Sequence, residues 1–200
     1  MVRASLFCVV TWAVCMAAAA SDCSTYANDL ASMRAADQSL RAYFTENGQL
    51  SQRQNNASEL IDRSNTLRMK SLLKQCGWPI ASKYGQDASV NAWLLIQHAD
   101  RDRQFQHEAL VLLEQAVKAG EARGGDLAYL SDRLAVSEGR PQLYGTQFRG
   151  VENCKLVLAP IDSREAVNAR RRAIPGMPTL EEYEKVANEQ ITPLECRPAQ

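Results

Sequence analysis

From the middle of the chain onward, a group of polar side chains has the chemistry needed for acid–base catalysis. They are His98, Asp100, Asp132, Arg133, Gln142, Tyr144, Thr146 and Gln147. A histidine can act as a general acid or base near neutral pH when a carboxylate holds its ring in place. The sequence therefore predicts a polar cleft in which His98 transfers protons and Asp100 or Asp132 positions it.

Several polar residues are candidates for binding a ligand in this cleft: Arg68, Arg133, Gln142, Tyr144, Thr146 and Gln147. The arginines can hold an anionic group, and Tyr144 can stack on a ligand or form a hydrogen bond with it. A structural role stays open, because the same side chains can brace helices and satisfy backbone groups in a buried loop.

Other common chemistries lack their sequence signatures in this chain. His98, Asp100, Asp102 and His107 are of metal-ligating types, but their spacing matches no zinc motif, so we expect no metal. There is no nucleophile elbow, and no glycine-rich phosphate loop follows a predicted strand. The sequence identifies no cofactor.

Two long helices are expected at residues 24–46 and 54–75, because apolar residues recur there at helical spacing. Their nearly equal lengths around a turn near residues 47–53 favour an antiparallel hairpin. In such a hairpin, residue i faces approximately residue 99 − i. This rule places Cys23 opposite Cys76 at the open end and predicts a disulfide between them.

The same rule gathers a polar layer in the middle of the hairpin: Arg34, Asp37, Arg41, Asp62 and Asn65. Asp37 lies on the apolar stripe of its helix and faces Asp62, and Arg34 faces Asn65. A buried carboxylate must be paired or protonated, because desolvation penalises its charge. The layer is expected either to be a set of ion pairs that fixes helix register or to form one wall of a polar pocket.

Residues 1–20 have the pattern of a signal peptide. Arg3 precedes an apolar run that ends in consecutive alanines, and small residues of this kind suit signal peptidase. The run is too short for a membrane span. We expect export to the periplasm or the exterior, with no membrane span after cleavage.

Removal of the leader leaves an even number of cysteines, namely Cys23, Cys76, Cys154 and Cys196. An even number in an exported chain is typical of disulfide pairing. If the helical hairpin joins Cys23 to Cys76, the second predicted disulfide is Cys154–Cys196.

The rest of the chain reads as shorter elements. Helices are expected at residues 87–99, 103–119, 126–137, 164–172 and 179–188, with Asp126 as one N-cap. A small β-hairpin is expected to end at residues 154–158 after a turn at 149–153. The fold class is therefore mainly α, a helical hairpin packed on a three-helix core, in one domain spanning residues 21–200.

The basic run Arg170–Arg172 is expected on the last but one of these helices. Asp162 and Glu165 are its candidate partners on a solvated face, and a surface patch for anions is the alternative.

Composition excludes some classes of function. The 200 residues include 23 basic and 23 acidic ones, so the formal net charge is zero. Proteins built to bind nucleic acid usually carry a basic excess, so no nucleic-acid partner is expected. Apolar residues make up 46% of the chain, which argues against wholesale disorder.

Four motifs in a fixed order carry a family resemblance: Gly-Trp-Pro at 77–79, Gln-His-Ala-Asp at 97–100, Leu-Ala-Tyr-Leu-Ser-Asp-Arg at 127–133, and Gly-Arg-Pro-Gln-Leu-Tyr-Gly-Thr-Gln at 139–147. Through them the chain resembles a bacterial family known as domain of unknown function 6624, over roughly residues 30–185. The resemblance supplies no activity. It implies that these polar stretches belong to one shared design.

The sequence leaves two functions open. One is a hydrolase-like enzyme with a cleft around His98, Asp132 and Tyr144 that acts on a small molecule. The other is a non-catalytic periplasmic binding or inhibitor-type protein that uses the same surface for a protein partner.

Overall fold

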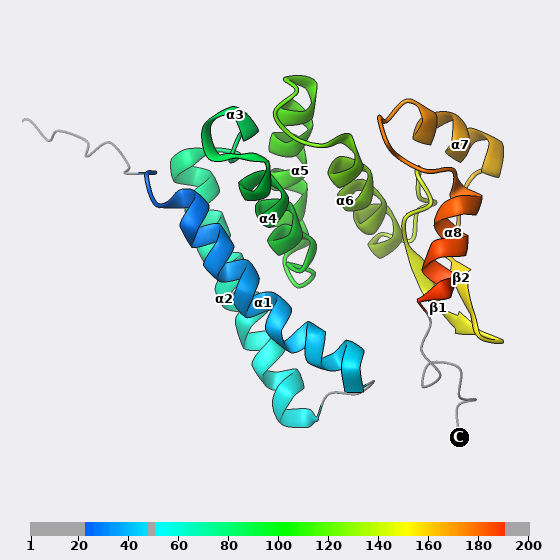
Figure 1. The fold of residues 1–200 in the computed structure, drawn as a ribbon, viewed down its shortest axis with the longest axis horizontal. Helices are drawn as coiled ribbons and strands as arrows, with labels where there is room; N and C mark the ends of the chain where they lie inside the picture. The colour runs from blue at the N-terminus through cyan, green and yellow to red at the C-terminus, as the bar shows by residue number, and fades with distance from the viewer. Residues whose placement is uncertain (1–22, 48–50, 191–200) are drawn as a thin grey trace, which may run out of the picture.

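A computed structural model describes residues 23–47 and 51–190 of the chain. Within these residues it contains eight helices and one two-stranded antiparallel sheet, so the prediction of a mainly helical fold is confirmed (Figure 1). The predicted signal peptide lies outside the described residues, and so does Cys196 of the second predicted disulfide.

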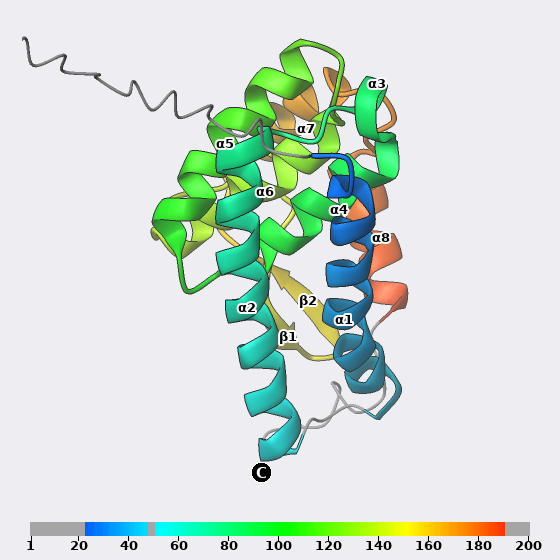
Figure 2. The same ribbon diagram turned by 90° about the vertical axis from the view of Figure 1, so that its left-hand side faces the viewer.

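The N-terminal hairpin consists of α1 (Tyr26–Asn47) and α2 (Gln52–Cys76), which lie side by side (Figure 2). Ser51 begins α2 with a capping box, in which Ser51 and Gln54 bond to each other's backbone N–H groups. Gly77 ends the helix with a φ of 71°, a conformation that glycine adopts without strain. The predicted Cys23–Cys76 disulfide is confirmed, with 6.0 Å between the Cα atoms.

The centre of the fold is made by α4 (Gln86–Gln97), α5 (Arg103–Lys118) and α6 (Gly124–Ser137). α4 contacts α1, α2, α5 and α6, as its apolar residues on all sides predict. The hydrophobic core runs from Tyr26 and Leu30 of α1 through Ala92 and Leu95 of α4 to Leu130 of α6.

The sequence analysis missed one helix in this region, and one of its predictions there is wrong. A one-turn helix, α3 (Ala81–Tyr84), precedes α4 and is too short to show a periodic pattern. Asp126 does not cap α6, because the helix begins two residues earlier, after Arg123. The Asp126 carboxylate instead accepts a hydrogen bond from Arg123 Nε (3.0 Å) within the first turn, where a negative charge is favourable.

The β-hairpin pairs β1 (Phe148–Glu152) with β2 (Lys155–Leu158). The predicted turn at 149–153 is wrong, because most of that segment belongs to β1. The connection is only Asn153 and Cys154, with φ of 51° and 58°. Tight two-residue hairpin loops favour such positive values, because their backbone twist matches that of the strands.

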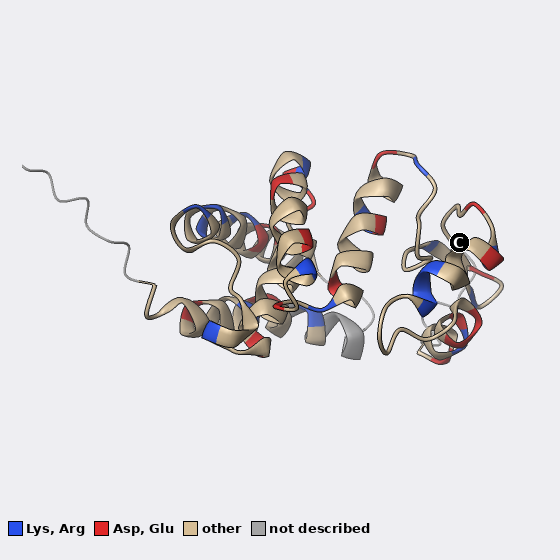
Figure 3. Cartoon of the chain, turned by 90° about the horizontal axis from the view of Figure 1, so that it is seen from above, with Lys and Arg blue, Asp and Glu red and all other residues tan. Residues whose placement is uncertain are grey.

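The chain closes with α7 (Arg164–Arg172) and α8 (Leu180–Glu189), capped by Ser163 and Thr179 respectively. These helices and the β-hairpin lie on the far side of α6 from the N-terminal hairpin (Figure 1). Basic and acidic residues are interspersed along the helices (Figure 3). No helix in the described ranges is long and apolar enough to cross a membrane.

Candidate functional site

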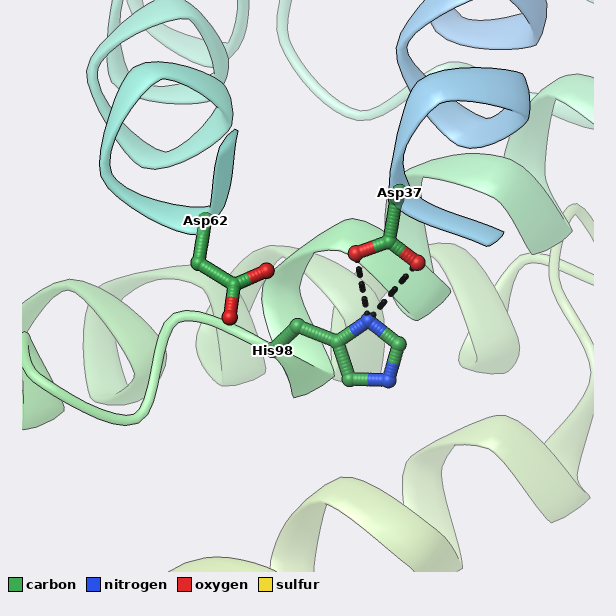
Figure 4. Close-up of side chains that lie close together, drawn as sticks. All are labelled: Asp37, Asp62 and His98. Atoms are coloured by element: carbon green, nitrogen blue, oxygen red, sulfur yellow. Dashed lines mark hydrogen bonds and ion pairs between the residues drawn. The ribbon is translucent and has the colours of Figure 1, made fainter. Parts of the chain in front are cut away.

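His98 and Asp37 form the centre of the site. His98 is the C-cap of α4, and its Nδ1 lies 2.8 Å and 3.0 Å from the two carboxylate oxygens of Asp37 on α1 (Figure 4). A carboxylate only accepts hydrogen bonds, so Nδ1 carries the hydrogen of the pair. Nε2 lies on the side of the ring away from Asp37 and makes no hydrogen bond to any described residue. It is therefore the nitrogen left for chemistry.

The Asp37 carboxylate is more deeply buried than the His98 ring, which suits one fixed nitrogen and one accessible nitrogen on that ring. The Asp37 side chain is fully buried, whereas that of His98 remains 17% exposed. Such a carboxylate is held by its surroundings, and the histidine ring keeps one edge within reach of solvent or a ligand.

Arg41 joins a second carboxylate to this pair. It lies one turn after Asp37 on α1, and its Nη2 is 3.3 Å from Asp37 Oδ1 and 2.7 Å from Asp62 Oδ1 on α2. The structure thus brings together Asp37, Arg41 and Asp62, which the hairpin rule grouped in one layer. His98 contacts this layer through its hydrogen bond to Asp37.

The other two residues of the predicted layer behave differently. Arg34 does not bond to Asn65, because its Nη1 donates to Asn91 Oδ1 on α4 (3.0 Å). Asn65 is buried on α2, and its Nδ2 has no hydrogen-bond partner among the described residues. Arg34 reaches α4 because α1 packs against α4 as well as α2.

The pKa values of the two carboxylates move in opposite directions. Burial raises the pKa of Asp37, but the hydrogen bond and charge of His98, with help from Gln38 and Arg41, outweigh it and bring the pKa down to about 2. Burial also raises the pKa of Asp62, and there Arg41 offsets it only in part. Carboxylates whose pKa values are driven apart are typical of acid–base sites.

A cavity of about 480 Å³ adjoins His98. Its walls are residues of α2 and of the segment after α4: Glu59, Asp62, Arg63, Thr66, Leu67, His98, Ala99, Asp100, Arg101 and Asp102. This volume is within the range of small-molecule sites. The cavity and the Asp37–His98 pair together form the candidate site.

Each acidic side chain in the cavity wall already has a basic partner. Glu59 pairs with Arg101, Asp62 with Arg41, Asp100 with Arg133 and Asp102 with Lys70. Arg63 forms no ion pair with any described residue. Its guanidinium is thus the charged group of the wall that remains available to a ligand.

Asp100 does not orient His98. Its carboxylate accepts from Arg133 Nε (2.7 Å) and, more weakly, from Gln106. Arg133 and Gln147 line a separate hollow of about 250 Å³. Arg68 lies elsewhere again, on the face of α2 next to α1, where it pairs with Asp29 at 2.7 Å.

Asp132 is also not bonded to His98, because its buried carboxylate holds the loop after α6. It accepts from the backbone N–H groups of Leu143 (2.7 Å), Tyr144 (3.1 Å) and Thr146 (3.0 Å), and from the Thr146 hydroxyl (3.0 Å). The carboxylate that contacts the His98 ring is therefore that of Asp37, and not that of Asp100 or Asp132.

The amide of Gln142 closes the same loop. It donates to the carbonyls of Gln147 (3.0 Å) and Ala159 (2.9 Å) and accepts from the Gln147 N–H (2.8 Å). Gln142 and Thr146 are buried, so the polar groups of this stretch satisfy one another and the backbone. The structure does not bring them into the cavity beside His98.

Among the described residues, one group of three His, Cys, Asp or Glu side chains is close enough to hold a metal ion. Ligand atoms of Asp37, Asp62 and His98 all lie within 4.8 Å of one another. The Arg41 guanidinium already donates to both carboxylates, so a metal ion there would have to displace it. His107 is not part of this group and bonds to Glu138. The absence of a metal stays a prediction.

Residues 25–193 match a family described as a family of unknown function, DUF6624. No curated protein and no solved structure matches the chain.

Proposed function

Because the chain belongs to this family of unknown function, DUF6624, we propose its function from the site alone: a hydrolase-like enzyme in which His98 is the general acid and base. The observation that carries the proposal is the buried Asp37 carboxylate on Nδ1 of a partly exposed histidine that lines a cavity. Asp37, rather than Asp100 or Asp132, is the positioning residue.

In the proposed reaction Nε2 transfers the proton, while Nδ1 stays bonded to Asp37. Asp37 keeps the hydrogen on Nδ1, so the lone pair of neutral His98 is on Nε2. Nε2 removes a proton from a water molecule while the water oxygen bonds to the electrophilic atom of the substrate. The ionised Asp37 stabilises the imidazolium that forms, and Nε2 then gives the proton to the leaving group.

The cavity supports a small, polar substrate. Its volume of about 480 Å³ is that of a small-molecule site. Arg63 is placed to hold a negatively charged group of the substrate, since the other charges of the wall are paired.

A panel of chromogenic esters, amides and phosphoesters tests this function. We expect His98→Gln to lower kcat/KM on any substrate that is turned over by about 100-fold or more, and Asp37→Asn to lower it comparably. His107→Gln is the matched control, because His107 is the second histidine of the chain and bonds to Glu138 on the surface. Hydrolysis that survives His98→Gln at the original rate would contradict the proposal.

We propose further that the protein works outside the cytoplasm. Residues 1–20 have a leader pattern, and the Cys23–Cys76 disulfide needs an oxidising compartment to persist. Fractionation of cells that express the full chain, with mass spectrometry of the mature N-terminus, tests this. We expect a product cut after residue 19 or 20 in the exported fraction.

A binding role for a protein partner is the second candidate. Leu60 and Leu67 lie seven residues apart on α2 and are 68% and 62% exposed, and Leu67 also lines the cavity. Exposed leucines on one helix face favour contact with another protein. Partner binding that is lost in Leu60→Ser with Leu67→Ser, but kept in His98→Gln, would favour this role over catalysis.

A further inference from the structure

A second cavity lies among α4, α6, α7, α8 and the connection from α7 to α8. Its volume is about 410 Å³. Its walls are Trp93, Arg123, Gly125, Asp126, Tyr129, Arg171, Ile174, Pro175, Gly176, Met177, Pro178 and Tyr183. It shares no lining residue with the cavity beside His98.

Arg171 is the most unusual residue of this wall. The basic run Arg170–Arg172 was expected on a solvated face, and for Arg171 that expectation is wrong, because only 1% of its surface is exposed. Arg170 pairs with Asp162, and Arg172 is exposed. The middle arginine therefore points inward from α7.

The charge of Arg171 has no carboxylate partner in the described part of the chain. Its Nε donates to the Pro178 carbonyl (2.6 Å) and its Nη1 to the Tyr144 carbonyl (2.7 Å). The guanidinium carbon lies 5.0 Å from the ring centre of Tyr183. Nη2 makes no hydrogen bond to the described residues. A buried charge is costly unless it is paired, so an anion is the group that this arginine lacks.

The remaining walls are aromatic and apolar. Tyr129 makes edge-to-face contacts with Trp93 and Tyr183, with ring centres 5.9 Å and 6.1 Å apart. The buried Nε1 of Trp93 has no hydrogen-bond partner among the described residues. Asp126 is already bonded to Arg123, and the carboxylates of Asp132 and Glu181 act on Arg171 only through space, so no carboxylate of the described residues bonds to its guanidinium.

We propose that this cavity binds a small carboxylate with an aromatic or apolar body. The carboxylate accepts hydrogen bonds from Arg171, and the body packs against Trp93, Tyr129 and Tyr183. Because Nε and Nη1 already donate to carbonyls, Nη2 is the nitrogen that donates a charge-assisted hydrogen bond to the carboxylate, and the rings supply the apolar contact. The proposal involves none of the residues of the proposed hydrolase, so either can fail without the other.

Calorimetry on the full mature protein tests the proposal with 3-phenylpropionate as the probe and 3-phenylpropionamide as its neutral counterpart. We expect saturable binding of the acid, at least about tenfold tighter than that of the amide. Arg171→Gln should weaken binding of the acid about tenfold or more. Arg172→Gln removes the same charge from the exposed neighbour and should leave the affinity unchanged.

Loss of Arg171 also removes its bonds to the Pro178 and Tyr144 carbonyls, so a second variant covers the case in which Arg171→Gln does not fold. A Cβ atom added at Gly125 meets no atom within 4 Å, so Gly125→Leu can narrow the cavity and leave Arg171 in place. We expect this variant to fold and to bind the acid at least about tenfold more weakly. Equal affinity for the acid and the amide, unchanged affinity in Gly125→Leu, or no binding of the acid up to about 10 mM would each overturn the proposal.

Discussion

The carboxylate of Asp37 contacts Nδ1 of His98 although 61 residues separate them in the sequence. The contact joins the middle of α1 to the last turn of α4 and buries the carboxylate completely. A histidine held in this way has one nitrogen fixed by its partner and the other left for proton transfer. The chemistry proposed for the protein depends on this one relationship.

The Asp37–His98 contact predicts a specific loss of stability in acid. The pKa of Asp37 is about 2 in the folded protein and 3.8 ordinarily. A lowered folded-state pKa gives stability that is present above pH 3.8 and is lost as the pH falls towards 2. This difference corresponds to about 2 kcal/mol of unfolding free energy, which Asp37→Asn should lack.

Urea unfolding of both proteins between pH 2 and pH 5 measures this effect. Asp62→Asn is the control, because the pKa of Asp62 is raised and its contribution therefore has the opposite sign. Its contribution is present at low pH and is lost as the pH rises. An acid limb that is equally steep in the wild type and in Asp37→Asn would show that the contact does not stabilise the fold.

Asp132 should contribute strongly to the stability of the fold and should not affect the environment of the His98 ring. In Asp132→Asn, an amide NH₂ replaces an oxygen that accepts from the backbone of the loop after α6, so donors face donors. We expect a loss of about 2–3 kcal/mol in chemical denaturation. The NMR signals of the His98 ring should not change, since no hydrogen bond joins the two residues.

The control for this prediction is Asp162→Asn. Asp162 pairs with Arg170 at an exposed site, where an ion pair contributes less than about 1 kcal/mol. A loss from Asp132→Asn no larger than that of the control would mean that the loop does not depend on its carboxylate.

Equal helix lengths made the N-terminal hairpin predictable from sequence. They fix the register of two antiparallel helices, and the register placed Cys23 beside Cys76 and Asp37 beside Asp62. The contact between His98 and Asp37 could not be predicted from helix lengths. It depends on how α4 packs across α1, and no periodic pattern links the two segments.

The polar loop and the basic run show a second limit. Asp132 could line a pocket or hold a loop. The outcome depends on whether the backbone N–H groups of the loop have other acceptors, and the residue types alone do not show this. In the run Arg170–Arg172, the three residues are of one type, and only their spacing from the apolar Val167 distinguishes them. α7 buries the middle one because Val167, four residues earlier, lies on the same buried face of the helix.

The Cys23–Cys76 disulfide should contribute strongly to stability. It closes a loop with a sequence separation of 53, and chain-entropy arguments give about 4 kcal/mol for such a loop, with 2–4 kcal/mol typical of measurements. Replacement of both cysteines by serine should lower Tm without changing the helical circular dichroism at low temperature. An unchanged Tm would contradict the prediction.

Arg41 should act as the resident cation between two carboxylates. Its replacement by Met leaves Asp37 and Asp62 without their shared partner, and we expect a loss of about 2 kcal/mol of unfolding free energy at pH 7. The variant also opens the one metal-type cluster of the described residues. Addition of about 1 mM Zn²⁺ should therefore raise the Tm of Arg41→Met and not that of the wild type.

Arg68→Met is the matched control for Arg41→Met. It breaks the Arg68–Asp29 pair, whose side chains are 51% and 30% exposed, so its cost should stay below about 1 kcal/mol. Zinc should not change the Tm of Arg68→Met, because this substitution leaves Arg41 bonded to Asp37 and Asp62. If zinc raises the Tm of the wild type as much as that of Arg41→Met, the guanidinium does not block the cluster. The Asp37, Asp62 and His98 set would then act as a metal site in the native protein.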